Sequence, residues 1–234
     1  MSALVVPLES NPEVFSELAH TIGLSPVLQF HDVFSLTEPD LLAFLPQPLL
    51  AVVVLFPISA GYESDRKVVP GSGAIRSPSI NWFKQTIKNG CGLYALLHAL
   101  ANLTPDYIVE DLVLNKLVLS NLRPDQSDDE IAKLVEQLEN SIQLDANFGL
   151  KGQTEAPEAD DDVLFHFITY VFGTDGHIYE LDGRRDGPVD LGSSELESNI
   201  LGDGKVAERV KFYIDHTEDQ DKDKFAVMSI GPSF

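Results

Sequence analysis

The chain has 234 residues, of which 44% are hydrophobic, and its 37 acidic side chains outnumber its 16 basic ones to give a formal net charge of −21. This hydrophobic content supports a packed core and excludes global disorder. The strong negative charge disfavours nucleic acid and anionic membranes as partners, and it suits either a basic partner or plain solubility.

The cysteine content and the apolar runs predict a soluble protein of the cytoplasm or nucleus. A single cysteine cannot form an internal disulfide. The N-terminal sequence MSALVVPLESNPEVF lacks the basic flank and long apolar stretch of a signal peptide. The longest apolar run, LLAVVVLF at 49–56, is far shorter than the roughly 20 residues that span a bilayer.

The N-terminal third predicts two strands and two helices. The sequence NPE at 11–13 supplies an N-cap, a proline at the first helical position and an acid in the first turn, which predicts a helix over 12–22. Strands are expected at 27–34 and 49–56, with a short helix at TEPDLLAFL between them. Glycine, proline, serine and charge without a period indicate a surface loop over 59–80.

The rest of the chain predicts further helices, a hairpin and a last strand. In chain order these are helices at 91–101, at 106–119 and from the capping box SDDE at 127–130, strands at 163–172 and 177–182, a helix at 204–215 and the strand KFAVMSIG. Residues 145–162 are loop-like and rich in acids. No linker separates two cores, so we expect one domain of mixed α and β structure over 1–234.

The only cysteine, Cys91, begins the helix predicted over 91–101 and lies between two glycines. A helix N-terminus presents unpaired N–H groups and a partial positive charge, and both favour a thiolate over a thiol. The flanking Gly90 and Gly92 would let an extended substrate approach the sulfur. Cys91 is therefore a candidate nucleophile, although a free cysteine is usually a small buried hydrophobe.

Two further side chains suit a nucleophilic cysteine. The amide of Gln85 and the backbone N–H of Cys91 can supply two donors to an oxyanion, although a glutamine before a helix is usually polar surface. Among the histidines, His98 lies two turns along the helix, about 10 Å from Cys91, and is expected to be a surface or packing residue. His166 interrupts an apolar strand, and it is either a satisfied core residue or the general base.

The hairpin register identifies a candidate acid for His166. A three-residue loop over 174–176, with its glycine in the left-handed conformation, puts His166 opposite Arg184. Asp182 is then the diagonal neighbour of His166 on the same face of the sheet, where a carboxylate can orient the imidazole. A slip of one residue would put the two side chains on opposite faces. The alternative role for Asp182 is a turn acid that bonds its own backbone.

These residues lie in a pattern that resembles the ubiquitin carboxyl-terminal hydrolase (UCH) family, which are papain-like cysteine proteases that act on ubiquitin. The resemblance rests on KQTIKNGCGLYALLHALAN, GQTEAP at 152–157 and FHFITYV…GHIYELDGR at 165–184, and it continues in PLESNPEVF and LLAVVVLFPI. It covers nearly the whole chain and is greatest for short members that consist of the catalytic core alone. The resemblance implies an α+β fold with a central antiparallel sheet flanked by helices and a knotted backbone path.

The resemblance also implies the role of each candidate residue. Cys91 would be the nucleophile, His166 the general base and acid, Asp182 the residue that orients the histidine, and Gln85 part of the oxyanion hole. The expected activity is removal of small adducts or short peptide extensions from the C-terminal glycine of ubiquitin through a thioester. Two alternatives are a hydrolase for another modifier that ends in Gly-Gly, and a protein that binds ubiquitin without cleaving it.

The expected partner is ubiquitin, whose basic C-terminal tail suits the acidic chain. Residues 145–162 match the family's active-site crossover loop. Weaker candidates for ubiquitin contact are Glu9, Glu13, Asp32, Glu155 and Glu158. The spacing of cysteine and histidine suggests no metal site, and no cofactor is expected. We expect a monomer that binds neither nucleic acid nor membrane.

Overall fold

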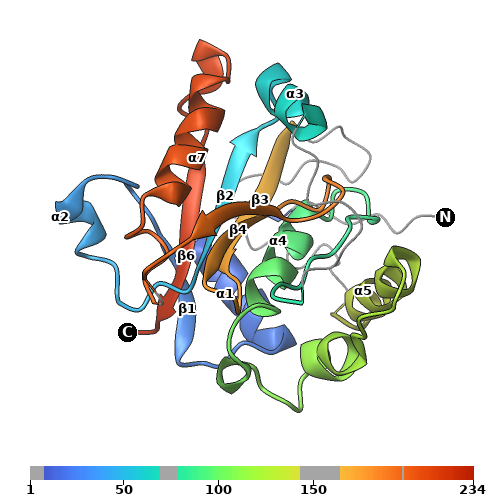
Figure 1. The fold of residues 1–234 in the computed structure, drawn as a ribbon. Helices are drawn as coiled ribbons and strands as arrows, with labels where there is room; N and C mark the ends of the chain where they lie inside the picture. Colours follow the sequence, from blue (N-terminus) through green and yellow to red (C-terminus); the bar gives the residue numbers. More distant parts are fainter. Residues whose placement is uncertain (1–7, 69–77, 143–163, 197) are drawn as a thin grey trace.

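A computed structural model of the chain describes residues 8–68, 78–142, 164–196 and 198–234. Within these ranges an antiparallel sheet of six strands, in the order β1-β6-β2-β3-β4-β5, lies between two groups of helices (Figure 1). The strands are β1 Leu28–Asp32, β2 Ala51–Pro57, β3 Phe165–Phe172, β4 His177–Leu181, β5 Val189–Ser193 and β6 Ala226–Pro232. The α-helices are α1 Pro12–Ile22, α2 Pro39–Leu42, α3 Ala60–Val68, α4 Cys91–Leu100, α5 Asp128–Ile142 and α7 Lys205–Asp215. This confirms the predicted α+β class.

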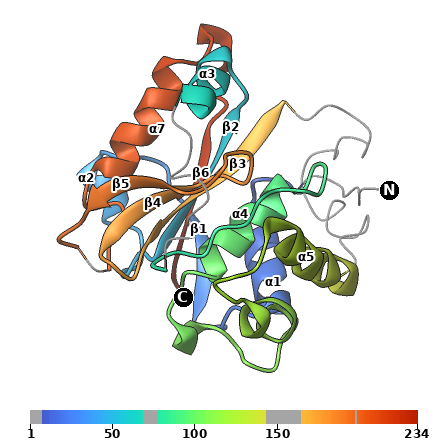
Figure 2. The same cartoon turned by 45° about the vertical axis from the view of Figure 1, so that its right-hand side comes forward.

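The sheet has a hydrophobic core on each face. Figure 2 shows α3 and α7 on one side of the sheet and α1, α4 and α5 on the other. Strand β2 serves both cores by alternation, since Val53 packs with the α1 and α4 side while Val52 and Val54 pack with the α7 side. Helix α4 is buried along its whole length between the sheet and the helices outside it, so its first residue, Cys91, has a fixed position.

Helix α1 has the predicted bounds for the predicted reasons. The Asn11 side chain accepts hydrogen bonds from the backbone N–H groups of Glu13 at 2.9 Å and Val14 at 3.4 Å, and Gly23 follows the last turn. The buried face of α1 includes Phe15, whose ring centroid lies 5.4 Å from that of Phe30 and 5.3 Å from that of Phe167. These aromatic contacts dock α1 against β1 and β3.

The segment 59–80 is not entirely a surface loop as predicted, because residues 60–68 form α3. This helix has no apolar stripe that sequence periodicity could detect, and Tyr62 is the fully buried side chain among those of residues 60–67. The available signal was Ser59, whose hydroxyl accepts from the N–H of Tyr62 at 3.1 Å in the manner of an N-cap. Helix α3 is therefore held by contacts with the rest of the fold more than by its own sequence pattern.

Two other differences from prediction are local. The segment 106–119, predicted as a helix, contains a 3₁₀ turn at Pro105–Tyr107 and a π-helical segment at Leu114–Val118. Helical turns of different pitch can bury the same apolar residues, so the apolar pattern alone does not distinguish them. The short edge strand β5 was not predicted, since its sequence VDLGS lacks a clear alternation. The expected crossover loop at 145–162 lies outside the described residues.

The packing of Phe15 predicts a large difference between core and surface truncations. Because Phe15 is 0% exposed, Phe15→Ala should lower the free energy of unfolding by about 3–5 kcal/mol. The matched control is Phe44→Ala, which removes the same ring from a position that is 81% exposed and should cost at most about 0.5 kcal/mol. Urea unfolding measures both values. Equal losses in the two variants would contradict the packing described here.

Candidate active site

Cys91 lies at the first position of α4, as the sequence predicted. Asn89 adopts a left-handed conformation, with φ of 59°, that turns the chain into the helix. The amide N–H of Tyr94 donates to the carbonyl of Gly90 at 3.0 Å and closes the first turn. The sulfur therefore lies among backbone N–H groups at the positive end of the helix dipole.

The two glycines beside Cys91 have a packing role that was not predicted, and the expected access of an extended substrate to the sulfur stays a prediction. A Cβ atom on Gly92 would lie 3.0 Å from Cβ of Leu8, so this glycine makes room for the N-terminal segment. A Cβ atom on Gly90 would lie 3.1 Å from the carbonyl oxygen of Ile87. Both positions are small because of packing within the protein, and the close approach of Leu8 places its neighbour Glu9 near the start of α4.

The predicted hairpin register is confirmed over the paired part of β3 and β4. Thr169 is opposite Leu181 and Phe172 is opposite Ile178, and the turn closes with a bond of 2.8 Å from the N–H of Gly173 to the carbonyl of His177. Strand pairing ends after Leu181, and the next residue, Asp182, turns its side chain toward His166. Nε2 of His166 and Oδ1 of Asp182 are 2.7 Å apart, and both side chains are almost completely buried.

His166 and Asp182 form a charged pair at neutral pH. Burial of the His166 imidazole lowers its pKa, but the Asp182 carboxylate and the hydrogen-bonded Cys91 more than offset this and raise the pKa of His166 to about 9. Burial raises the pKa of Asp182, yet His166 and two further donors hold that pKa well below its usual value. Because Nε2 is bonded to Asp182, Nδ1 is the ring nitrogen left for Cys91, and an imidazolium there stabilises a thiolate.

Gln85 is fixed against the turn that carries Asp182. Its backbone N–H donates to the carbonyl of Gly183 at 2.9 Å, and a Cβ atom on Gly183 would lie only 2.8 Å from Cβ of Gln85. The Gln85 side chain donates through Nε2 to the carbonyl of Ile87 at 3.2 Å, which leaves the second N–H of the amide for another acceptor. Gln85 therefore connects the segment just before α4 with the turn that contains Asp182 and Gly183.

The other histidine on α4, His98, has a packing role. Its side chain is 1% exposed, and its Nε2 accepts from the backbone N–H of Phe83 at 3.0 Å. Burial lowers the pKa of His98 to about 4, so the ring is neutral at physiological pH. His98 thereby secures the segment that carries Gln85 without adding a second charge near His166.

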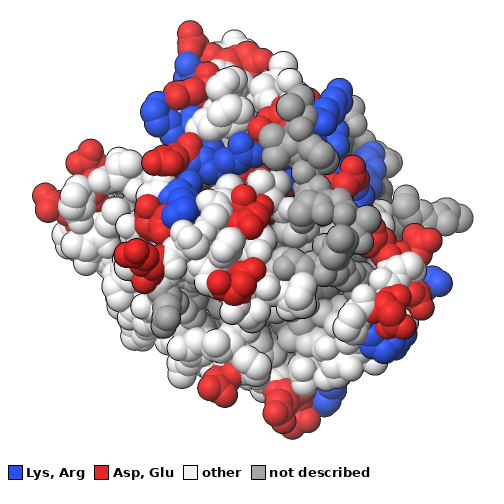
Figure 3. Space-filling view, in the orientation of Figure 1, with Lys and Arg blue, Asp and Glu red and all other residues white. Residues whose placement is uncertain are grey.

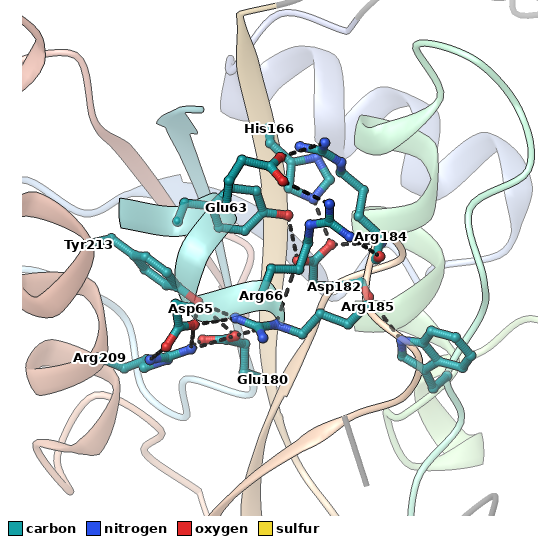
Figure 4. Close-up of polar contacts among 12 residues, drawn as sticks. Glu63, Asp65, Arg66, His166, Glu180, Asp182, Arg184, Arg185, Arg209 and Tyr213 are labelled. Atoms are coloured by element: carbon teal, nitrogen blue, oxygen red, sulfur yellow. Dashed lines mark hydrogen bonds and ion pairs between the residues drawn. The ribbon is translucent and has the colours of Figure 1, made fainter. Parts of the chain in front are cut away.

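A set of polar side chains behind Asp182 was not identified from the sequence (Figure 4). The Tyr62 hydroxyl donates to Oδ2 of Asp182 at 2.7 Å, and Arg185 lies 3.7 Å from the same oxygen. Arg185 is fully buried and pairs with Asp65 at 2.5 Å and Glu180 at 3.2 Å. The residues come from α3, β4 and the turn after β4, and only their tertiary arrangement brings them together, so no local sequence signal could have found them.

Two of the five acids predicted to contact substrate line one surface groove. Glu13 and Asp32 border a hollow of about 560 Å³ between α1, β1 and the segment around Phe44, and exposed aromatic rings at Phe34, Phe44 and Phe234 project into it. Glu9 is half-buried beside Leu8 and is not part of this groove. Glu155 and Glu158 lie outside the described residues.

Acidic side chains form separate patches on the face that Figure 3 shows, much of which is uncharged, and several basic side chains lie beside α3 and α7. In the part of the chain that the structure describes, no cluster of three or more histidine, cysteine or acidic side chains is arranged to hold a metal ion. No helix among those same residues has the length and apolar character to cross a membrane.

Comparison with known proteins gives one consistent result. The sequence profile of "Ubiquitin carboxyl-terminal hydrolase, family 1" matches residues 5–215. The chain is 40% identical to ubiquitin carboxyl-terminal hydrolase YUH1 of Saccharomyces cerevisiae, over 98% of this chain and 97% of that protein. It is 36% identical to the isozyme L1 of Rattus norvegicus, over 86% and 88% of the two chains.

The fold is also similar to that of a solved structure. The catalytic domain of UCH37 from Trichinella spiralis, crystallised with ubiquitin vinyl methyl ester, superimposes with a TM-score of 0.70 at 22% identity. The alignment covers 98% of this chain and 96% of that domain. At this identity the likeness concerns the fold.

The raised pKa of His166 predicts how the stability of an Asp182→Asn variant depends on pH. A group whose folded pKa exceeds its ordinary value stabilises the fold below the ordinary pKa, about 6.5, and this contribution is lost as the pH rises through about 9. The stability penalty of Asp182→Asn should therefore be greatest below about pH 6.5, should still be large at pH 7, and should shrink by on the order of 2–3 kcal/mol between pH 7 and pH 10. Urea unfolding at the two pH values measures it.

The surface pair of His177 and Asp190 offers a matched control. Its side chains are 35% and 43% exposed, so Asp190→Asn should cost no more than about 1 kcal/mol at either pH. An Asp182→Asn penalty that is the same at pH 7 and pH 10 would show that His166 is not charged by its contact with Asp182.

Proposed function

The chain belongs to the ubiquitin carboxyl-terminal hydrolase family 1 and is a cysteine-type hydrolase, and we propose that it removes small adducts or short peptide extensions from the C-terminal glycine of ubiquitin. The observation that carries this proposal is the buried contact of 2.7 Å between His166 and Asp182, together with the hydrogen bond between Cys91 and the same imidazole. This arrangement supplies a nucleophile, a proton carrier and an orienting acid in one line.

In the proposed mechanism the Cys91 thiolate attacks the carbonyl carbon of the terminal glycine. A C–S bond forms, and the carbonyl electron pair moves to the oxygen, which accepts hydrogen bonds from the Gln85 amide and the Cys91 backbone N–H. When the tetrahedral intermediate collapses, His166 gives its proton to the leaving amine or thiol and a thioester remains. The roles of these four residues are part of the proposal.

The thioester is then hydrolysed. His166, now neutral, takes a proton from water as the water oxygen attacks the thioester carbon. Collapse of this second intermediate breaks the C–S bond, releases ubiquitin with a free carboxylate and regenerates the thiolate beside the imidazolium. Asp182 holds Nε2 of His166 through both steps, so Nδ1 carries the proton each time.

A ubiquitin that carries a C-terminal electrophile tests the nucleophile directly. We expect one ubiquitin to attach covalently per chain, with the bond at Cys91, because the electrophilic carbon replaces the scissile carbonyl. Cys91→Ala should form no adduct and should lose all measurable turnover of a ubiquitin C-terminal amide, while its affinity for ubiquitin stays within a few-fold of the parent. Intact-mass and peptide-mass spectrometry detect the adduct and its site.

The same assay separates the alternatives. An equal rate with a different modifier that ends in Gly-Gly would make ubiquitin only one of several substrates. Binding of ubiquitin without any adduct or turnover would indicate a binding protein. Hydrolysis by Cys91→Ala at the parental rate would disprove the mechanism.

We further propose that the groove bordered by Glu13 and Asp32 receives the body of ubiquitin, with these acids facing its basic surface and tail. Exposed rings at Phe34, Phe44 and Phe234 give this groove an apolar floor, and apolar surface ringed by charge is typical of interaction sites. We place this activity in the cytoplasm or nucleus and expect a monomer; the chain's large negative charge supports a partner that is basic.

Substitutions in this groove should weaken binding and leave chemistry intact. Asp32→Lys together with Phe34→Ala should raise KM by about tenfold or more with kcat changed less than about twofold, since the contacts are present equally in the ground and transition states. The control is Asp111→Lys, the same charge change at a side chain that is 96% exposed. Steady-state kinetics on a ubiquitin C-terminal amide measure both, and an unchanged KM in the groove variant would remove this site from the proposal.

A further inference from the structure

The two carboxylate oxygens of Asp182 have separate partners. Oδ1 accepts from Nε2 of His166 at 2.7 Å and from the backbone N–H of Arg184 at 2.8 Å. Oδ2 accepts from the hydroxyl of Tyr62 at 2.7 Å. Among the described residues, Nε of Arg185 also lies near Oδ2, at 3.7 Å, which is beyond hydrogen-bond distance.

We propose that Tyr62 is a positioning residue for the reaction: its hydroxyl fixes the plane of the Asp182 carboxylate so that Oδ1 stays on His166. This inference rests on the proposed function, because it assigns Tyr62 a part in holding the general base. The Tyr62 ring packs against the His166 imidazole with centroids 5.7 Å apart, a contact that a phenylalanine keeps, whereas the hydroxyl contacts none of the reacting atoms. It acts through Asp182, and its effect on catalysis should appear through the protonation of His166.

Tyr62 is a rigid donor. Its side chain is 0% exposed, and its ring packs against that of Phe56 with centroids 5.0 Å apart. The Arg184 guanidinium also lies over the Tyr62 ring, 5.4 Å from its centroid. Burial and the adjacent Asp182 raise the pKa of the Tyr62 hydroxyl, so it remains a hydrogen-bond donor throughout the pH range in which the protein is folded. The ring contacts do not involve the hydroxyl, so a phenylalanine can keep them.

Loss of this hydroxyl leaves Nε of Arg185 as the polar neighbour of Oδ2 within the part of the chain that the structure describes. Because a buried carboxylate oxygen without a hydrogen bond is costly, the carboxylate would turn Oδ2 toward Nε of Arg185. Arg185 cannot come to meet it, since Asp65 and Glu180 hold its guanidinium at 2.5 Å and 3.2 Å. The rotation must therefore be made by Asp182, and it moves Oδ1 away from His166.

The charged and titratable groups that face the pair come from every element packed against it. They are Cys91 and His98 on α4, Tyr62 and Arg66 on α3, and Arg184 and Arg185 after β4. Of these, Tyr62 is the one whose bond to Asp182 can be removed by deleting a single oxygen atom while every charge is kept. The variant Tyr62→Phe thus isolates the positioning effect.

The closing experiment compares Tyr62→Phe with Tyr170→Phe. Tyr170 is an equally buried tyrosine whose hydroxyl donates to Glu180 at 3.1 Å, a carboxylate that keeps Tyr213 and Arg209 as further donors. Both variants lose one hydroxyl that is bonded to a buried carboxylate, and Tyr62→Phe should lose the more stability in urea, because Glu180 keeps its other donors in Tyr170→Phe. Only Tyr62→Phe should lose turnover, by about tenfold in kcat with KM unchanged.

The pH profile distinguishes positioning from a general loss of structure. In Tyr62→Phe the alkaline limb of kcat/KM should move to lower pH by at least roughly half a unit, because the imidazolium has lost part of its carboxylate partner. Tyr170→Phe should keep the parental limb. A limb in Tyr62→Phe that stays in place or moves to higher pH would overturn the proposal, as would an equal shift in both variants.

Direct titration of His166 by NMR makes the test independent of substrate. The imidazole signals of labelled parent and variants are followed from pH 6 to pH 10, with His166 assigned by its absence in His166→Gln. If the parent hydrolyses no ubiquitin derivative, the proposed function fails, yet a lower titration midpoint for His166 in Tyr62→Phe would still support the role of Tyr62. An unchanged midpoint would overturn that role even if the enzyme is active.

Discussion

The buried hydrogen bond between His166 and Asp182 is the interaction on which the rest of the site depends. Removing a carboxylate and an imidazolium from water is costly, and their mutual attraction offsets that cost only if the remaining lone pairs and protons also find partners. The fold meets this condition on both sides. The Arg184 backbone N–H and the Tyr62 hydroxyl donate the further hydrogen bonds that the Asp182 carboxylate needs, and Cys91 forms the second hydrogen bond of the His166 imidazole. Without those additional contacts the pair would be neutral, and a neutral His166 would not stabilise a thiolate.

Three segments far apart in the sequence must meet for this pair to contact Cys91. Helix α4 is placed by burial along its length, β3 by its two neighbouring strands, and the turn after β4 by its contacts with the segment before α4. That last connection is specific: the carbonyl of Asp182 accepts from the indole N–H of Trp82 at 3.1 Å, and the Gln85 N–H donates to Gly183. The same backbone contacts therefore position the orienting acid and the proposed oxyanion donor together, so displacing one would displace the other.

The sequence could predict the part of this arrangement that is local. The loop over 174–176 has a length that fixes the register of β3 on β4, and this register places Asp182 within reach of His166 by geometry alone. The position of Cys91 at the start of a helix was predictable for the same reason. The contact between that helix and the hairpin was not, because it joins residues 75 positions apart whose approach is decided by packing of the whole core; there the resemblance to a known family supplied what periodicity does not.

The errors in prediction have a common physical origin. Helix α3 was missed because its buried surface is polar, and hydrophobic periodicity does not register a helix whose inner face carries Tyr62 and Asp65. The packing role of Gly90 and Gly92 was missed because an absent side chain can make room for a neighbour in the same chain, in this case Ile87 and Leu8, and substrate access at these glycines stays a prediction. In both instances the residue type was informative, but the identity of its partner depends on tertiary structure.

The acidity of the surface and the charge state of the buried site are physically separate. The ionic groups around His166 are balanced among the described residues: four carboxylates at Glu63, Asp65, Glu180 and Asp182 face four guanidinium groups at Arg66, Arg184, Arg185 and Arg209. Exposed charges are screened by salt over about 8 Å at physiological ionic strength, whereas buried pairs are screened much less. The formal charge of −21 can therefore govern how a basic partner approaches, while the proton on His166 is governed by contacts within about 4 Å of it.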